Sequence, residues 1–335
     1  MSTRREFLRN AALSGAAGML WPVSGALAAE PPPETTRIRM GHTPVGTCWA
    51  PQYMGEEMLR AEGFSEVRYV RVTGSEQVYP ALASGELDIS MAFIAPFVVQ
   101  ADAGGAVVIL AGIHPGCIEL FGSERVRTLR DLKGKKASIV ALNSAPHAFI
   151  ASMMTYVGMN AQRDIDWVVQ PERDEAVRDL AEGRIDALIV SPPFSYEMRR
   201  KKVGHVVVNM TSDRPWSQYF CCVLTGNREF VRKNPVATKR AMRAILKGAN
   251  LCAGSPEPSA RSLAKRGFAP SYEAALQTVR EVPYARWRDY DTEDTVRFYA
   301  LRLHEAGMIK SSPKKVLAEA TDFRFLNELK KELKS

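Results

Sequence analysis

The stretch Leu82-Ala83-Ser84-Gly85-Glu86-Leu87-Asp88-Ile89 returns 98 residues later as Leu180-Ala181-Glu182-Gly183-Arg184-Ile185-Asp186-Ala187. Each copy is typical of a helix end, a glycine and then an apolar strand. Glycine suits this position because helices commonly end in a residue with left-handed backbone angles. Two copies of one α/β unit predict two similar lobes. Ligands bind at the carboxyl ends of strands in α/β sheets, and clefts between domains are preferred small-molecule sites.

The segments around the two copies also match. A strand at 37–40 is followed by a loop and a helical run at 50–61, and a strand at 136–140 is followed by a loop and a helical run at 146–157. Further strands are expected at 67–72, 87–93, 106–113, 166–169, 187–190 and 206–209, with a return crossing at 219–224. The pattern is helical from Gly226 onward, and we assign these helices to the first lobe because they are too long for the second.

The predicted fold is therefore α/β and two-lobed, each lobe a mixed sheet flanked by helices, with the ligand cleft between the lobes. Lobe one is expected at 37–127 plus 222–335, and lobe two at 128–221. Residues 29–36, with Pro31-Pro32-Pro33, are expected to form a tether.

The first 28 residues resemble an export signal. Thr3-Arg4-Arg5-Glu6-Phe7-Leu8-Arg9 contains a twin-arginine pair, a mildly apolar stretch covers 11–20, and Ala26-Leu27-Ala28 is a small-x-small cleavage site. This order is that of a secretory leader, and paired arginines indicate the bacterial route for folded proteins. The alternative is a chance arginine pair on a cytosolic helix. No later stretch offers the roughly 18 apolar residues of a membrane span. We expect a periplasmic protein.

Charge and cysteine content set further bounds. The formal net charge is +8, and the basic residues are scattered apart from Arg199-Arg200-Lys201-Lys202 and the C-terminal lysines. No base-reading module accompanies them, so a nucleic-acid partner is not expected. The five cysteines are odd in number and lack the spacing of a disulfide framework, which leaves a single disulfide open but unassigned.

The run Arg130-Asp131-Leu132-Lys133-Gly134-Lys135-Lys136, followed by a strand and a small-residue loop, resembles the inter-lobe border of type II periplasmic substrate-binding proteins. The two repeated strings are similar to paired segments of the branch that serves ATP-driven importers of nitrate, alkanesulfonates, taurine and thiamine-precursor pyrimidines. The resemblance covers roughly residues 37–310. It implies a monomeric, non-catalytic solute-binding protein without a cofactor. Such a protein delivers a small organic or oxyanion ligand to an ABC permease in the inner membrane. The run Thr47-Cys48-Trp49 is bulkier than the first loop of that branch.

An enzyme on the same fold is the alternative function. A related pyrimidine synthase uses a cysteine-rich run and a histidine as iron ligands or reactive groups, but Phe220-Cys221-Cys222-Val223 lacks the further cysteines of that run. Neither a nucleophile elbow nor a P-loop or dinucleotide fingerprint is present in the sequence. His42, Cys48, His114 and Cys117 fall at or after strand ends, yet their spacings match no zinc signature, so no metal is predicted.

Candidate ligand contacts are the residues that follow each strand, where helix N-termini offer unpaired N–H groups. The set comprises Thr43, Trp49, Ser75, Ile94, Ala95 and His114 in lobe one, Asn143, Ser144, His147, Ser191 and Pro192 in lobe two, and Tyr219 near the return crossing.

Each of the main candidates also has a structural explanation. Asn143 and Ser144 can cap the next helix, Trp49 can belong to the core, and Tyr219 can pack at the hinge. His114 can donate to a ligand or simply occupy the turn before Pro115. The few charged side chains in the set favour a small, neutral or singly anionic, partly apolar ligand.

Overall fold

The structure is a computed structural model that describes residues 30–43, 46–72 and 74–333. The chain divides into two units, Met1–Pro32 and Pro33–Ser335, and all the described helices and strands lie in the second. The predicted leader at 1–28 lies outside the described residues. In the part of the chain that the structure describes, no helix is both long and apolar enough to cross a membrane.

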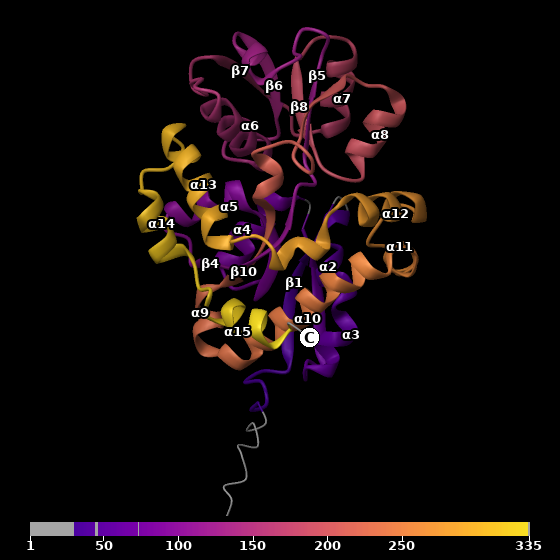
Figure 1. Cartoon of the computed structure of the whole chain (residues 1–335), viewed down its shortest axis with the longest axis vertical. Coiled ribbons are helices and arrows are strands. Elements are labelled where there is room, and N and C mark those ends of the chain that lie inside the picture. Colours follow the sequence, from indigo (N-terminus) through magenta and orange to yellow (C-terminus); the bar gives the residue numbers. More distant parts are fainter. Residues whose placement is uncertain (1–29, 44–45, 73, 334–335) are drawn as a thin grey trace, which may run out of the picture. The chain divides into compact units, whose positions relative to one another are not determined.

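Lobe one contains two sheets in the lower half of Figure 1. Strands β1 (Arg37–His42) and β2 (Glu66–Arg71) pair in parallel. In the second sheet, β10 (Phe220–Asn227) lies between β3 (Ile89–Phe93) and β4 (Val107–Pro115) and is antiparallel to both. Every residue of these three strands is buried.

Short helices connect the strands of lobe one. They are η1 (Thr47–Trp49), α2 (Ala50–Met54), α3 (Glu56–Ala61), α4 (Ser75–Ala83) and α5 (Ile94–Asp102). The helical run expected at 50–61 is thus two helices, divided at Gly55.

Lobe two is one five-stranded sheet at the top of Figure 1, in the order β7-β6-β8-β5-β9. Its strands are β5 (Glu119–Gly122), β6 (Lys135–Ile139), β7 (Ile165–Val169), β8 (Ala187–Val190) and β9 (His205–Asn209). β6 is parallel to β7 and β8, whereas β5 is antiparallel to β8 and β9. The helices of this lobe are η2 (Leu129–Leu132), α6 (Ala145–Tyr156), α7 (Arg173–Ala181), α8 (Phe194–Lys201) and η3 (Trp216–Gln218).

Two details of the expected lobe boundaries are wrong. The boundary at 127/128 leaves β5 in lobe one, but β5 pairs with two strands of the lobe-two sheet. The chain therefore crosses between β4 and β5. The second boundary, at 221/222, falls inside β10, which pairs throughout with lobe-one strands. The first boundary is misplaced because β5 comes before the second repeated unit in the sequence. This short antiparallel strand nevertheless pairs with strands of that unit's sheet.

The predicted repeat is present in the structure at atomic detail. Gly85 and Gly183 both have left-handed φ angles, +76° and +72°. Asp88 Oδ2 accepts the N–H of Arg39 in β1 at 2.7 Å, and Asp186 Oδ2 accepts the N–H of Lys136 in β6 at 3.0 Å. An arginine pairs with each of these two carboxylates at 2.6 Å. The two similar sequence strings thus make the same contact in each lobe: the aspartate of the string accepts a backbone N–H from the first strand of its unit.

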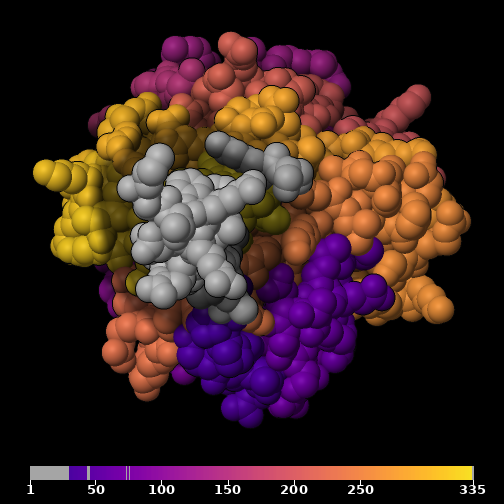
Figure 2. Space-filling view, turned by 60° about the horizontal axis from the view of Figure 1, so that its bottom comes forward, coloured from indigo at the N-terminus to yellow at the C-terminus, as the bar shows by residue number. Residues whose placement is uncertain are grey.

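The C-terminal helices pack mainly on lobe one. They are α9 (Arg228–Lys233), α10 (Pro235–Gly254), α11 (Pro256–Lys265), α12 (Tyr272–Glu281), η4 (Tyr284–Arg288), α13 (Thr292–Glu305), α14 (Pro313–Ala320) and α15 (Arg324–Glu332). α10 contacts α2 and α3, and α13 and α14 contact α5, while α13 also reaches α6 of lobe two. Figure 2 shows the orange and yellow C-terminal residues on the same face as the indigo residues of the first strands and helices.

Candidate ligand-binding site

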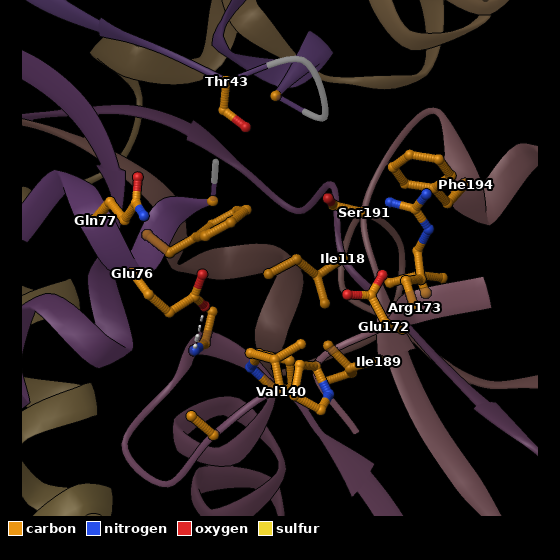
Figure 3. Close-up of a pocket in the computed structure, with 18 of the residues that line it drawn as sticks. Thr43, Glu76, Gln77, Ile118, Val140, Glu172, Arg173, Ile189, Ser191 and Phe194 are labelled. Carbon is orange, nitrogen blue, oxygen red and sulfur yellow. Dashed lines mark hydrogen bonds between the residues drawn. The ribbon is translucent and has the colours of Figure 1, made fainter. Parts of the chain in front are cut away.

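A cavity of about 650 Å³ lies between the two lobes and takes its lining from both (Figure 3). Lobe one contributes Thr43, Gly46, Trp49, Gly74, Glu76, Gln77 and Phe93. Lobe two contributes Val140, Ala141, Ala145, Pro146, Pro171, Glu172, Arg173, Ile189, Val190, Ser191 and Phe194, and Ile118 belongs to the first crossing segment. The volume is within the range of about 300–1,000 Å³ that is common for small-molecule pockets.

Four helices begin at this cavity. Gly74 immediately precedes α4, and Ala145, Arg173 and Phe194 are the first residues of α6, α7 and α8. The first N–H groups of a helix have no partner within the helix, and the aligned peptide dipoles place partial positive charge there. These helix starts therefore favour an anionic or strongly polar ligand group.

Charged side chains of both signs line the cavity. The guanidinium carbon of Arg173 lies 3.1 Å from the centroid of the Phe194 ring, and its Nη2 lies 3.4 Å from Asp174 Oδ1. Partial burial lowers the pKa of Arg173, but an arginine remains cationic in proteins. Glu76 and Glu172 supply carboxylates, placed on opposite sides of the cavity in Figure 3.

Glu76 also connects the two lobes. Its Oε1 lies 3.5 Å from the N–H of Ala145, at the start of α6, and Figure 3 draws this contact as a dashed line. A carboxylate at a helix N-terminus is stabilised by the partial charge there. Glu76 thus occupies one of the positions that would suit the anionic group of a ligand.

Apart from Thr43, Gln77 and Ser191, most of the remaining lining is apolar. Trp49 contacts Phe93 edge-on at a centroid distance of 6.4 Å, and Ile118, Val140 and Ile189 face the cavity. Trp49 is only 1% exposed, so it is a core residue, and it also forms part of the cavity wall. Both interpretations of Trp49 from the sequence therefore fit the structure. Such walls suit the apolar part of an organic ligand.

Some predicted site residues are at this cavity. Thr43, Trp49 and Ser191 line it. Ser75 is the first residue of α4, between two lining residues, although its side chain is outside what the structure describes. Ser144 is the N-cap of α6 next to the lining residue Ala145, and its buried hydroxyl has no hydrogen-bond partner among the described residues.

The other predicted residues are placed elsewhere. Ile94 and Ala95 are fully buried in α5, because that helix starts directly after β3 without a loop. His114 is buried within β4, and Tyr219 stacks on Phe298 at a centroid distance of 3.9 Å. Pro192 follows Ser191 but does not line the cavity.

Asn143 and His147 line a second hollow, together with Leu142, Trp167 and Met308. The N–H of Asn143 donates to His147 Nδ1 at 2.9 Å, and Asn143 has a left-handed φ of +63°. Burial lowers the pKa of His147 to about 4, so this imidazole is neutral near pH 7. The loop after β6 therefore turns these two side chains away from the main cavity.

The predicted set omits most of the lining residues, among them the charged, amide and aromatic side chains of Glu76, Gln77, Glu172, Arg173 and Phe194. Two of these residues, Glu172 and Arg173, could have been selected from the sequence. Residues 166–169 were predicted as a strand, and the rule that selected residues after strands would also have selected Glu172 and Arg173 had it been applied there.

The potential metal ligands are outside the cavity lining. Cys48, His114, Cys117 and Cys222 form one group in the core, whereas His42 packs against Tyr53 and Phe268 at centroid distances of 5.7 and 5.0 Å.

Two α/β lobes, joined by crossing strands and enclosing a cavity at their strand ends, are the two-lobed fold that solved periplasmic binding proteins share. The alkanesulfonate-binding protein SsuA from Xanthomonas axonopodis pv. citri, bound to MOPS, has this fold, with a TM-score of 0.67 and 17% identity over 88% of this chain and 100% of that chain. The periplasmic nitrate-binding protein NrtA from Synechocystis PCC 6803 gives a TM-score of 0.72 and 15% identity over 91% of this chain and 90% of that chain. The periplasmic aliphatic sulphonate-binding protein SsuA from Escherichia coli gives 0.65 and 17% over 84% and 91%.

Residues 31–266 match the NMT1-like family, and the chain belongs to that family. No curated protein matches the sequence.

Proposed function

We propose that the protein is the periplasmic solute-binding component of an ABC importer. In this role it captures a small organic oxyanion between its lobes and delivers it to a membrane permease. The observation that carries the proposal is the cavity lined by both lobes, at which four helices begin. A ligand that touches both lobes favours their closed arrangement, which is how a binding protein can signal that it is loaded.

The chemistry of the lining supports an organic oxyanion. Arg173 and the helix starts favour negative charge, whereas Trp49, Phe93 and Ile118 provide apolar walls. A cavity of about 650 Å³ is much larger than a bare inorganic ion needs. Solved proteins of the same fold bind alkanesulfonates and nitrate. The size and the apolar walls favour the organic ligand class for this chain.

A binding role also fits the lining better than catalysis does. Among the described residues that line the cavity there is no cysteine nucleophile and no histidine that could activate the hydroxyl of Thr43 or Ser191. The carboxylates Glu76 and Glu172 supply acceptors for a donor group on the ligand. We therefore propose capture without turnover.

The test is titration calorimetry with three ligands of equal chain length: an alkanesulfonate, an alkylcarboxylate and the uncharged alcohol. The two anions should bind and the alcohol should not. Arg173→Gln should weaken binding of the anions by about ten-fold or more, because a hydrogen bond to a charged group contributes roughly 1.5–3 kcal/mol.

Arg178→Gln is the matched control, since Arg178 lies in the same helix, is exposed and does not line the cavity. Equal binding of the alcohol and the anions would refute the oxyanion assignment. Unchanged anion affinity in folded Arg173→Gln would show that the ligand lies elsewhere.

A further inference from the structure

Four side chains that can each ligate a metal meet in the core of lobe one, next to the wall of the cavity. The ligand atoms of Cys48, His114, Cys117 and Cys222 all lie within 4.8 Å of one another. Their residues are between 0% and 4% exposed. None of them lines the cavity, so the group is distinct from the ligand-binding site.

These four residues come from parts of the chain that are far apart in sequence. Cys48 lies in η1, and Cys117 lies in the segment that crosses from β4 to β5. His114 and Cys222 are register partners in the β4–β10 pair. The group therefore joins the first loop of lobe one to both segments through which the chain passes between the lobes.

The backbone at Cys117 is held in an unusual conformation. Cys117 has a φ of +80°, which non-glycine residues rarely adopt, and Gly116 before it has a φ of +70°. The N–H of Cys117 donates to Thr211 Oγ1 at 3.1 Å. An added Cβ at Gly116 would lie 2.6 Å from Thr211 Cα. Strained backbone of this kind is concentrated at functional sites, and here it places a thiol inside the group.

The histidine has the arrangement expected of a metal ligand. His114 Nδ1 lies 3.3 Å from the carbonyl oxygen of Pro115, and the buried Nε2 has no hydrogen-bond partner among the described residues. When one ring nitrogen donates to a carbonyl, the other presents a lone pair, and ligating histidines are commonly oriented in this way. A buried polar atom without a partner costs free energy, which a bound cation would offset.

The structural alternative is that the cysteines serve only as small apolar residues of the core. This explanation suits Cys252, which lies outside the group and whose surroundings in α10 are those of an ordinary core position. It does not explain three thiols gathered around a histidine with an unpartnered nitrogen. The fifth cysteine, Cys221, lies with its Sγ 3.0 Å from Cys117 Sγ and offers a competing partner for that thiol.

We propose that Cys48, His114, Cys117 and Cys222 bind one thiophilic cation of the Zn²⁺ type in a closed, four-coordinate site. Three cysteines and one histidine form a known ligand set of structural zinc sites, with Zn–S bonds of about 2.3 Å and therefore sulfur atoms about 3.8 Å apart. Side-chain shifts of about an ångström would bring the present group to that geometry. Binding would release the thiol protons to solvent as the sulfur atoms become thiolates.

The cation would stiffen the segments through which the chain crosses between the lobes. With four protein ligands, the site has no open position for a substrate, which separates it from catalytic zinc sites. It would tie the crossing segments to each other and to the loop that carries Trp49. The proposal is independent of the ligand in the cavity, and either can fail without the other.

The experiment measures metal on the mature chain, purified without chelator and with thiols protected from oxidation. Elemental mass spectrometry should find about one zinc per chain. Protein unfolded and then refolded with Co²⁺ should show the thiolate-to-cobalt charge-transfer absorption of a tetrahedral sulfur-rich site. Because this readout uses the wild-type chain, it stands even if a variant fails to fold.

Variants then assign the ligands. Cys222→Ala and His114→Asn should reduce bound metal from about one per chain to near zero, whereas Cys252→Ala, the matched buried control, should retain it. Cys221→Ala should also retain it. A non-reducing peptide map that shows a Cys117–Cys221 disulfide in the native protein would overturn the proposal. So would free thiols with no zinc and no cobalt absorption, or metal that is retained in folded Cys222→Ala.

Discussion

Glu119 is a buried carboxylate that shares its cation with another acid. Its Oε1 lies 2.9 Å from Arg199 Nη1, while Arg199 Nη2 lies 2.6 Å from Glu281. Glu119 Oε2 has no hydrogen-bond partner among the described residues. Burial raises the pKa of Glu119 to about 7; Arg199 opposes this rise and Glu281 adds to it. One guanidinium between two carboxylates cannot fully offset the loss of hydration.

This carboxyl predicts an unusual pH dependence of stability. Its pKa rises from 4.5 to about 7 on folding, so the folded state binds the proton more tightly. The contribution of Glu119 is therefore most favourable below pH 4.5 and is lost as the pH rises through about 7. Glu119→Gln should remove this loss, raising the free energy of unfolding near pH 8 by on the order of 1–3 kcal/mol relative to wild type.

Urea unfolding of both proteins near pH 5 and pH 8 provides the measurement. Glu124→Gln is the control, because the Glu124 side chain is 81% exposed in the loop after β5. Parallel pH profiles of wild type and Glu119→Gln would mean that Glu119 stays ionised in the folded protein.

Of the individual residues proposed from the sequence as ligand contacts, some line the cavity and others do not, for identifiable reasons. The rule that ligand contacts follow strands selects three residues that line the cavity, Thr43, Trp49 and Ser191. It failed at Ile94 because the strand passes directly into a helix, which leaves no loop to face the cavity. Three members of the cysteine–histidine group, Cys48, His114 and Cys117, stand at or after strand ends in the sequence, but their spacing matches no zinc signature. Cys222 joins them only through the tertiary fold.

Among the elements, the helix α10 shows how a single small residue determines close packing. An added Cβ at Gly248 would lie 2.2 Å from the carbonyl oxygen of Pro51 and 3.0 Å from the nitrogen of Gly55. Both atoms belong to the backbone of the α2–α3 segment, so they cannot move aside as a flexible side chain could. Gly248 therefore permits the contact that holds the first helices against the C-terminal part of lobe one.

Gly248→Ala should destabilise the protein by about 1–3 kcal/mol or more, as expected of an overpacked core. Gly254→Ala in the same helix should be neutral or slightly stabilising, because nothing lies within 4 Å of its added Cβ and alanine favours the helix. Thermal unfolding of the two variants compares them directly. Equal melting temperatures would show that α10 and α2 can separate at no cost.

The strands show how much of the secondary structure can be predicted from the local sequence pattern. Apolar runs and the turn residues around them predict every strand of the three sheets except β5. That strand has only four residues, Glu119–Gly122, and follows the turn that ends β4. Its place depends on pairing with β8 and β9, which are more than 60 residues away, and local sequence does not encode such a partner.

For the whole molecule, the expected export route determines where the proposed metal site would acquire its cation. The four proposed ligands are almost completely buried, so a cation must enter before the core closes. The leader predicted at 1–28 contains paired arginines, which direct folded proteins across the membrane. A chain exported in the folded state would carry its metal with it, acquired where it folded.

Export is therefore the last expectation to test. Replacing Arg4 and Arg5 together by lysine should trap full-length precursor in the cytoplasm, because the route recognises the arginine pair and not its charge alone. Arg9→Lys, outside the pair, should be exported as wild type. Cell fractionation followed by N-terminal sequencing measures both export and cleavage, which we expect to leave Ala29 as the first residue. Normal export of the Arg4/Arg5 variant would point to export as an unfolded chain, and any metal would then have to be acquired in the periplasm.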